Sequence, residues 1–293
     1  MQEVKKRMKD FFDTIDPKML ARIRAFRLMD DDFMSVVFDG DNEATEFLLR
    51  ILLDRNDLRV KRVMTQKEKR NLFGRSVKLD ILAEDFSGRK YNVEVQRENA
   101  GASPRRVRYN LAMLDSHTLK KNQDFNELPE TYIIFITEND YLGLGKPVYR
   151  VQKNFDCTDS DGRNLPFDDG CNILYVNGAY RGNDALGRLM HDFCTPNAEE
   201  MNYDELAEKV RFHKQQEGGF RTMSKIMEEY GDEREAEGKK LGRAEGEKVG
   251  MLRGKLAAYF DLIKSGLLSV KDAAAKLEMS EDALLQQMAA AGK

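Results

Sequence analysis

Apolar residues recur with two different periods along the first part of this 293-residue chain. Residues 30–53 show the three- and four-residue spacing of a helix, interrupted at Gly40, and residues 105–121 show it again after Pro104. Between them the spacing changes to a two-residue alternation typical of strands. The alternating segments are 58–65, 76–85 and 90–96. The pattern therefore predicts a helical region, three strands and a further helix.

Continuous apolar runs follow. Residues 131–137 (TYIIFIT) are apolar almost throughout, which is typical of a strand covered on both faces. Two more strands are predicted at 147–151 and 172–176. This order of elements predicts an α/β fold with a mixed β-sheet core flanked by helices.

Past Pro196 the pattern changes, and only helices are predicted, at 203–215 and 223–230. Glycine then occurs at every fourth position from Gly238 to Gly254 in a highly charged segment. Each interior glycine costs a helix about 0.5–1 kcal/mol relative to alanine. We therefore favour a flexible linker or weakly helical arm over a close helix–helix contact between two copies.

The chain ends in a predicted helical pair. Ser269 and Asp272 form a capping box for a helix over 270–277, and Ser280 precedes a second helix over 281–290. The spacing is that of a helix-turn-helix, but the second helix starts with two acidic residues, which disfavours DNA reading. A packing or tethering module is the better interpretation. The predicted organisation is a helical segment (1–28), a main domain (29–221), a charged glycine-periodic arm or linker (222–260) and the helical pair (261–293).

Composition narrows the class of protein. Three cysteines without a CxxC pair indicate neither a disulfide framework nor a zinc ribbon, and they suit a reducing cytoplasm. The basic N-terminus is not followed by the apolar stretch of a signal peptide, and no run has transmembrane length. We expect a cytoplasmic protein without a membrane partner.

Positive charge is concentrated around the first strands. Residues 50–121 hold 18 Lys and Arg against 9 Asp and Glu, in a chain whose net charge is −3. A local excess of nine positive charges in an acidic chain suits contact with phosphates. Scattered solvated charges are the alternative explanation.

The two strands at 76–85 and 90–96 carry the candidate chemistry. Alternation places Asp80 on the polar face of the first strand, and Glu94 and Gln96 on the polar face of the second. If Ser87 is the centre of the turn, Asp80 faces Glu94 with Cβ atoms about 4.5–5.5 Å apart. Opposed carboxylates repel unless a cation lies between them, and oxygen ligands suit Mg²⁺, with Mn²⁺ or Ca²⁺ as alternatives.

Several ordered motifs carry a resemblance to a known family. The segment LDILAEDFSGRKYNVEVQ, with VMTQKEKR before it and RVRYNLAMLD and TYIIFIT after it, resembles the recombination-promoting nuclease and putative transposase family. This family lies within the PD-(D/E)XK nuclease superfamily, and the resemblance covers residues 29–221. It implies a restriction-endonuclease-like fold, a divalent metal and endonucleolytic cleavage of DNA.

The resemblance also assigns site residues. It maps the conserved acid onto Asp80 and the E-x-K or E-x-Q element onto Glu94 and Gln96. A helix before the first strand often supplies a further acid in this superfamily, and of the two candidates, Glu43 and Glu46, we favour Glu46.

One position departs from the superfamily pattern, which usually has lysine where this chain has Gln96. Glutamine orients water but supplies no positive charge. Lys78 or Lys90 could provide that charge, and Lys78 is preferred because it shares the strand face of Asp80. The candidate DNA contacts are Gln66, Arg75, Arg97, Arg105, Arg108 and Tyr109.

Two hypotheses follow. The leading one is a Mg²⁺-dependent DNA endonuclease that hydrolyses phosphodiester bonds and promotes recombination. The alternative is a nuclease-fold protein with weak or no catalysis, acting as a DNA-binding module or as a homo-oligomer formed through the C-terminal arm.

Overall fold

The computed structural model describes residues 10–69 and 75–291 of the chain. They divide into two compact units, the first ending at Lys225 and the second comprising Ile226–Lys293. None of the helices formed by these described residues is long and apolar enough to cross a membrane.

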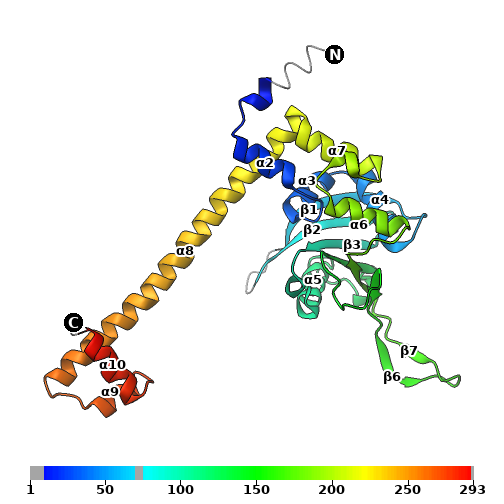
Figure 1. Cartoon of the computed structure of the whole chain (residues 1–293). Helices are drawn as coiled ribbons and strands as arrows, with labels where there is room; N and C mark the ends of the chain where they lie inside the picture. The colour runs from blue at the N-terminus through cyan, green and yellow to red at the C-terminus, as the bar shows by residue number, and fades with distance from the viewer. Residues whose placement is uncertain (1–9, 70–74, 292–293) are drawn as a thin grey trace. The chain divides into compact units, whose positions relative to one another are not determined.

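A six-stranded mixed sheet forms the centre of the first unit, in the order β1-β2-β3-β4-β8-β5 (Figure 1). The first three strands pair antiparallel, β3, β4 and β8 run parallel, and β5 pairs antiparallel with β8. The strands are β1 Val60–Lys69, β2 Val77–Asp85, β3 Lys90–Gln96, β4 Thr131–Thr137, β5 Val148–Arg150 and β8 Cys171–Asn177. The predicted mixed-sheet α/β fold is confirmed, and each predicted strand corresponds to one of these six.

Helices cover both faces of the sheet (Figure 1). On one face lie α3 and α4. They are separated at Gly40, where the apolar pattern is interrupted and φ is +65°. On the other face lies α5. The helices and 3₁₀ turns of this unit are α2 Pro17–Ala25, α3 Asp31–Phe38, α4 Asn42–Leu53, η1 Asn99–Ala102, α5 Pro104–Ser116, η2 Phe125–Glu127, α6 Ala185–Cys194, η3 Ala198–Glu200 and α7 Asp204–Gln215.

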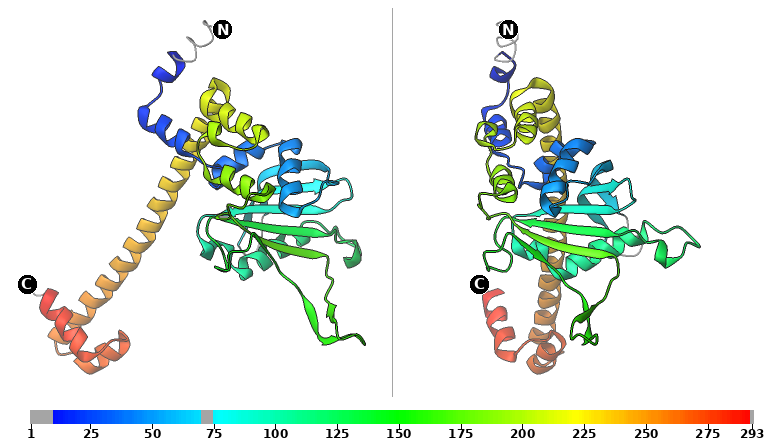
Figure 2. Two further views of the ribbon diagram at one scale, coloured as in Figure 1. Left: turned by 45° about the vertical axis from the view of Figure 1, so that its right-hand side comes forward. Right: turned by 90° about the vertical axis from the view of Figure 1, so that its right-hand side faces the viewer.

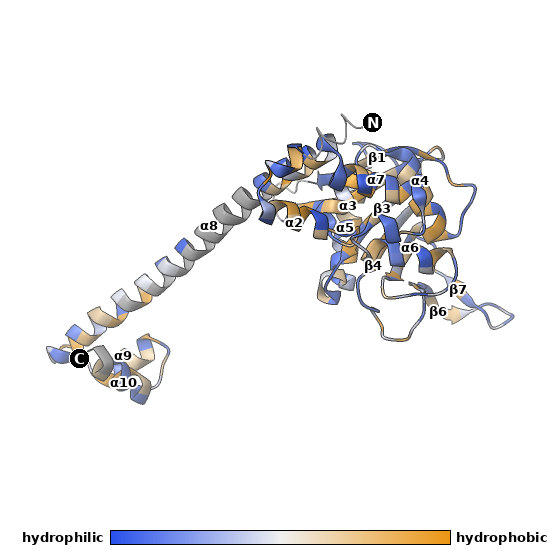
Figure 3. Cartoon of the chain, turned by 45° about the horizontal axis from the view of Figure 1, so that its top comes forward, coloured by the Kyte–Doolittle hydropathy of each residue, from blue (hydrophilic) through white to orange (hydrophobic). Residues whose placement is uncertain are grey.

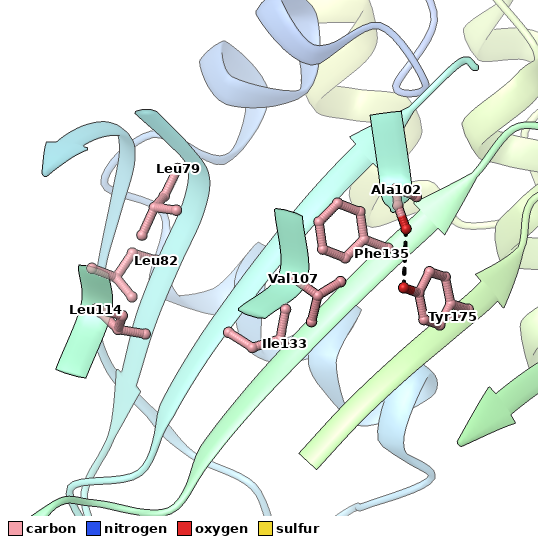
Figure 4. Packing of buried hydrophobic residues seen from close by; sticks show 8 residues of the cluster. All are labelled: Leu79, Leu82, Ala102, Val107, Leu114, Ile133, Phe135 and Tyr175. Carbon is pink, nitrogen blue, oxygen red and sulfur yellow. Dashed lines mark hydrogen bonds between the residues drawn. The ribbon is translucent and has the colours of Figure 1, made fainter. Parts of the chain in front are cut away.

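Apolar side chains fill the space between α5 and the sheet (Figure 4). Val107 and Leu114 of α5 pack with Leu82, Ile133 and Phe135 of the strands. Colouring by hydropathy shows that hydrophobic and hydrophilic residues both occur along the strands and helices of this unit (Figure 3). The cluster packs α5 against β2, β4 and β8. The strand β3, which carries Glu94 and Gln96, lies between β2 and β4 in the sheet.

A two-stranded hairpin, β6 Asn154–Thr158 with β7 Asn164–Pro166, extends away from the sheet (Figure 2). The sequence pattern did not predict it. All the residues of both strands are exposed, so their pattern carries no buried face from which a strand could be recognised.

The second unit is helical. The helix α8 Glu217–Lys264 continues through the glycine-periodic segment, for which the sequence left a helical arm and a linker open. Its last turns pack with α9 Val270–Lys276 and α10 Glu281–Ala291 around Phe260 and Leu284. Ser269 caps α9 by accepting the backbone N–H of Asp272 over 3.1 Å, as the capping box predicted.

Truncating the side chain of Leu114 tests how strongly α5 is held on the sheet. Leu114 is fully buried, so we expect Leu114→Ala to lower the free energy of unfolding by about 2–5 kcal/mol. Urea denaturation followed by circular dichroism measures this change. The exposed Phe125 is the matched control, since Phe125→Ala should change stability by less than about 0.5 kcal/mol. Equal effects of the two substitutions would contradict this packing.

Candidate functional site

The turn between β2 and β3 sets their register. The strands pair antiparallel from Glu84–Lys90 to Ile81–Val93, which is the register expected for a turn centred on Ser87. The next step in this register brings Asp80 opposite Glu94. Regular pairing stops there, however, and the backbone N–H of Val95 donates to the Asp80 carboxylate over 3.2 Å. The two strands therefore separate at the two acids, and a carboxylate takes the place of a backbone acceptor.

An irregularity in β1 lies beside the same acid. Gln66 has φ +49°, a left-handed conformation that costs a residue with a side chain roughly 1–2 kcal/mol. The pairs that flank it in the β1–β2 register are Thr65–Ile81 and Lys67–Leu79. Gln66 therefore lies opposite Asp80. Strained backbone that a structure retains is often found at functional sites.

This irregularity changes which side chains share a face. Thr65 donates its hydroxyl to Asp39, just after α3, and Gln66 donates its amide to Ser35 within α3. Two consecutive side chains of β1 thus contact the same side of the sheet, which strict alternation forbids.

The interruption extends into β2, where Leu79 and Leu82 pack in one cluster on the α5 side (Figure 4). Strict alternation would put these two leucines on opposite faces. Strict alternation, which would place Leu79 on the same face as Ile81, therefore fails in β2, because the strand is irregular at Asp80 between these two residues.

Glu94 is fully buried and is contacted by α5. The guanidinium of Arg106 lies 3.4 Å from one Glu94 oxygen, and the Asn92 amide donates to the other over 3.1 Å. Arg106 also donates over 3.1 Å to the side-chain oxygen of Gln96 and to the carbonyl of Gly101. One guanidinium thus joins Glu94 and Gln96 to the segment that leads into α5.

Gly101 is required for this arrangement. A Cβ built at this position would lie 2.0 Å from the Gln96 side-chain oxygen, which is far inside van der Waals contact. The absence of a side chain lets η1 approach the end of β3 closely enough for its carbonyl to accept from Arg106.

Burial perturbs the pKa values of both carboxylates, and the charge of Glu94 also acts on Asp80. Burial and the nearby Glu94 charge raise the pKa of Asp80 well above its ordinary value. Burial likewise raises the pKa of Glu94 to about 7, although Arg106 and the Asn92 amide oppose this change. Two acids that ionise with difficulty in one buried gap are a typical feature of a functional site.

A third acid that the sequence reasoning missed lies at the start of α3. The negative charge of Asp31 raises the pKa values of both Asp80 and Glu94. Its neighbour Asp32 also has a raised pKa, caused by burial and by Asp31, while Lys78 lowers it. The only sequence signal was a run of three aspartates, which usually indicates an ordinary helix N-terminus.

The structure does not bring Glu46 to the two acids. Its carboxylate accepts the backbone N–H of Val60 over 2.9 Å and pairs with Arg50. Val60 lies opposite Asp85, five residues from Asp80 and so about 17 Å further along β2. The further acid expected from a preceding helix thus comes to the site from α3 and not from α4.

The other candidate residues lie at varied places around the gap. Lys78 is exposed and close enough to Asp32 to lower its pKa. Arg97 forms long ion pairs with Asp30 and Glu138, at 3.6 and 3.5 Å. Arg105 and Arg108 are exposed on α5, where the Tyr109 hydroxyl also donates to the Arg75 carbonyl. Lys90, the alternative to Lys78, instead donates to Thr118.

The donor set suits a hard divalent cation held partly by water and substrate. In the described part of the chain, no three His, Cys, Asp or Glu side chains form a group that could hold a metal by themselves. Mg²⁺ commonly uses only one or two carboxylates, together with waters and phosphate oxygens. Asp80 and Glu94 can provide those two carboxylates.

The raised pKa of Glu94 predicts how pH changes stability. The folded protein binds this proton more tightly than the unfolded chain, whose glutamate has a pKa of 4.5. Its contribution is therefore fully present below about pH 4.5 and is lost as pH rises through about 7. We expect the unfolding free energy of the wild type in EDTA to fall across this window relative to Glu94→Gln. Urea titrations at several pH values measure the difference.

The exposed Glu98 provides the control, since Glu98→Gln should reproduce the pH dependence of the wild type. The variant Glu94→Gln also removes the charge that raises the pKa of Asp80, so the difference between the curves reports the titration of Glu94 together with its effect on Asp80. If the difference in unfolding free energy between the wild type and Glu94→Gln stays constant from pH 4 to pH 8, the raised pKa assigned to Glu94 is contradicted.

Comparison with known proteins agrees with this geometry. Residues 39–177 match the family model described as PD-(D/E)XK nuclease family transposase. The matched segment contains all six strands of the sheet and α5, whereas Asp31 lies before it. No curated protein and no solved structure matches the chain. The domain that carries Asp80, Glu94 and Gln96 therefore belongs to the PD-(D/E)XK nuclease family transposases.

Proposed function

We propose that this domain is a divalent-metal-dependent DNA endonuclease that hydrolyses phosphodiester bonds and thereby promotes recombination. The observation that carries the proposal is the pair of buried carboxylates, Asp80 and Glu94, where β2 and β3 separate. Two buried acids of this kind are destabilising without a cation, since burial and like charge both oppose ionisation. A bound cation would offset this cost, because its positive charge favours ionisation of both acids.

The residues present fit Mg²⁺ as the cofactor, with Mn²⁺ or Ca²⁺ as alternatives. Asp80 and Glu94 would hold the ion, and Asp31 adds negative charge nearby. A bound divalent ion would polarise the phosphoryl group and favour ionisation of an attacking water.

Arg106 is our candidate for the positive charge that Gln96 cannot supply. Its guanidinium has five N–H donors in a planar fork, of which the contacts with Gln96 and Gly101 use the Nη1 group. The Nη2 group is directed at Glu94 over a long 3.4 Å. Because Nη2 carries two N–H donors, one of them remains for a phosphate oxygen while the other contacts hold the side chain in place.

Gln96 acts as a positioning residue in this scheme. Its side-chain oxygen is occupied by Arg106, which fixes the amide so that its N–H₂ group remains the donor available to water or phosphate. The surrounding basic residues would hold the DNA backbone. We assign this role to Lys78, Arg75, Arg97, Arg105 and Arg108, with Gln66 and Tyr109 at the margins.

Cleavage of plasmid DNA tests the proposal. We expect the wild type to nick or linearise plasmid with Mg²⁺ or Mn²⁺ and to be inactive in EDTA. The double variant Asp80→Asn/Glu94→Gln keeps the shape of both side chains but removes their charge. Its cleavage rate should fall at least about 1000-fold, because metal activation supplies several kcal/mol of transition-state stabilisation. Gel electrophoresis of time courses provides the measurement.

Equal activity of the wild type and the double variant in every metal would overturn the enzyme proposal. DNA binding with a steep salt dependence but no cleavage would instead favour a nuclease-fold binding protein. The ion pair between Glu94 and Arg106 would suit such a binding protein, because the guanidinium partly neutralises the buried carboxylate without a metal.

Substitution of Arg106 tests its role separately. We expect Arg106→Gln to lower kcat about 100- to 1000-fold, as loss of a donor to developing negative charge typically does. Arg106→Lys should recover part of that loss, because it restores charge without the planar fork. The exposed Arg163, on the β6–β7 turn, gives the control Arg163→Gln, which should cleave at the wild-type rate. A loss confined to KM would identify Arg106 as a binding residue only.

A further inference from the structure

A small aromatic pocket lies at the start of α5, beside the carboxylate site. Its volume of about 300 Å³ is at the lower end for ligand sites, so it suits one ring-sized group. Its walls are mostly apolar and include three tyrosine rings and one arginine. The lining residues are Pro104, Val107, Tyr141, Leu142, Tyr149, Arg150, Val151, Ile173 and Tyr175.

The rings of this pocket are held in place. Tyr141 and Tyr175 stack with centroids 4.3 Å apart and planes inclined by 19°. The Tyr175 hydroxyl donates to the Ala102 carbonyl over 3.0 Å (Figure 4). Because Ala102 ends η1, this hydrogen bond also connects the pocket to the segment that contacts Gln96.

An ordered loop holds an apolar side chain at the pocket. Asp140 accepts backbone N–H groups from Leu142, Gly143 and Gly145 and also the hydroxyl of Tyr149. This network fixes the loop while leaving Leu142 53% exposed. The loop thus presents an exposed apolar side chain beside the aromatic walls of the pocket.

The sheet register gives the distance from the pocket to the carboxylates. Glu94 pairs with Phe135 of β4, Phe135 with Tyr175 of β8, and Tyr175 with Tyr149 of β5. These residues therefore form one row across neighbouring strands. Strands lie about 4.8 Å apart, so Tyr175 is about 10 Å from Glu94, a span of a few nucleotides along a DNA strand.

We propose that this pocket binds one unpaired nucleobase of the DNA strand whose backbone reaches Asp80 and Glu94. Every base has a flat face that stacks on an aromatic ring, and Arg150 adds a positive charge for the adjoining phosphate. A base inside a duplex is stacked and paired, so it enters only when flipped out or single-stranded. The inference rests on the proposed nuclease function and specifies its substrate as DNA that is unpaired near the cut.

Equilibrium binding to matched oligonucleotides tests the proposal without cleavage. The protein carries Asp80→Asn and is kept free of metal, and one probe is a thymidine oligonucleotide of about ten residues. The other probe has the same backbone with every base replaced by an abasic site. Loss of one stacked base typically costs about 5- to 150-fold in affinity, so the base-bearing probe should bind more tightly by that factor. Fluorescence anisotropy measures both affinities.

Two substitutions at Tyr141 separate stacking from packing. Tyr141→Leu keeps apolar bulk but removes the ring. It should bring the ratio of the affinities for the base-bearing and abasic probes close to one. Tyr141→Phe keeps the ring and should retain the ratio of the parent protein. Phe86 is 75% exposed in the β2–β3 turn, and Phe86→Leu is the matched control that should also retain it.

An unchanged ratio in Tyr141→Leu, or no difference between the probes in the parent protein, would overturn the proposal. So would concentration-dependent self-association that Tyr141→Leu abolishes in sedimentation experiments, since the pocket would then hold another copy of the chain. A different result would contradict the nuclease proposal alone. In that case the wild-type protein would cut no DNA in any metal, although the base-bearing probe would still bind more tightly than the abasic probe.

Discussion

Two negative charges that share a buried gap between β2 and β3 are the constraint on which this domain depends. Asp80 and Glu94 repel each other and are removed from water, so surrounding groups must compensate them. The compensation comes from neighbouring elements: the N–H of Val95 in β3 at Asp80, and the guanidinium of Arg106 in α5 at Glu94. The position of α5 on the sheet is thus linked to the electrostatics of the site.

Such an arrangement persists because the rest of the sheet is rigid. Residues of β4 are buried almost without exception, and the parallel strands on either side hold it in register. This frame can retain the left-handed Gln66 and the interrupted alternation beside Asp80, each of which would relax in an isolated hairpin. The irregular part of the sheet and the site coincide, as expected where function and local stability compete.

Much of this could be predicted from the sequence because it depends on local pattern. Alternation and the turn at Ser87 gave the register that brings Asp80 opposite Glu94. The break in alternation at Gln66 could not be predicted, since a polar residue with positive φ has no sequence signature. Asp31 was not identified as a site residue, and Arg106 was considered only as one of several basic residues for the DNA backbone. Tertiary packing of α3 and α5, which the local pattern does not reveal, brings them near Asp80, Glu94 and Gln96. Glu46 was preferred only for its place on a helix before β1, and that helix leads to the opposite end of β2.

The same packing gives a physical reason for glutamine where the superfamily usually has lysine. The side-chain oxygen of Gln96 accepts from Arg106, a contact that a lysine, which has no acceptor, could not make. Lysine there would also place a second positive charge against the guanidinium. Gln96 and Arg106 are therefore compatible as a pair, with the charge on α5 and the acceptor on β3. Gly101 is part of the same arrangement, since any side chain at that position would displace the side chain of Gln96. In this chain the positive charge beside Glu94 therefore lies on the helix α5 and not at the strand position of Gln96.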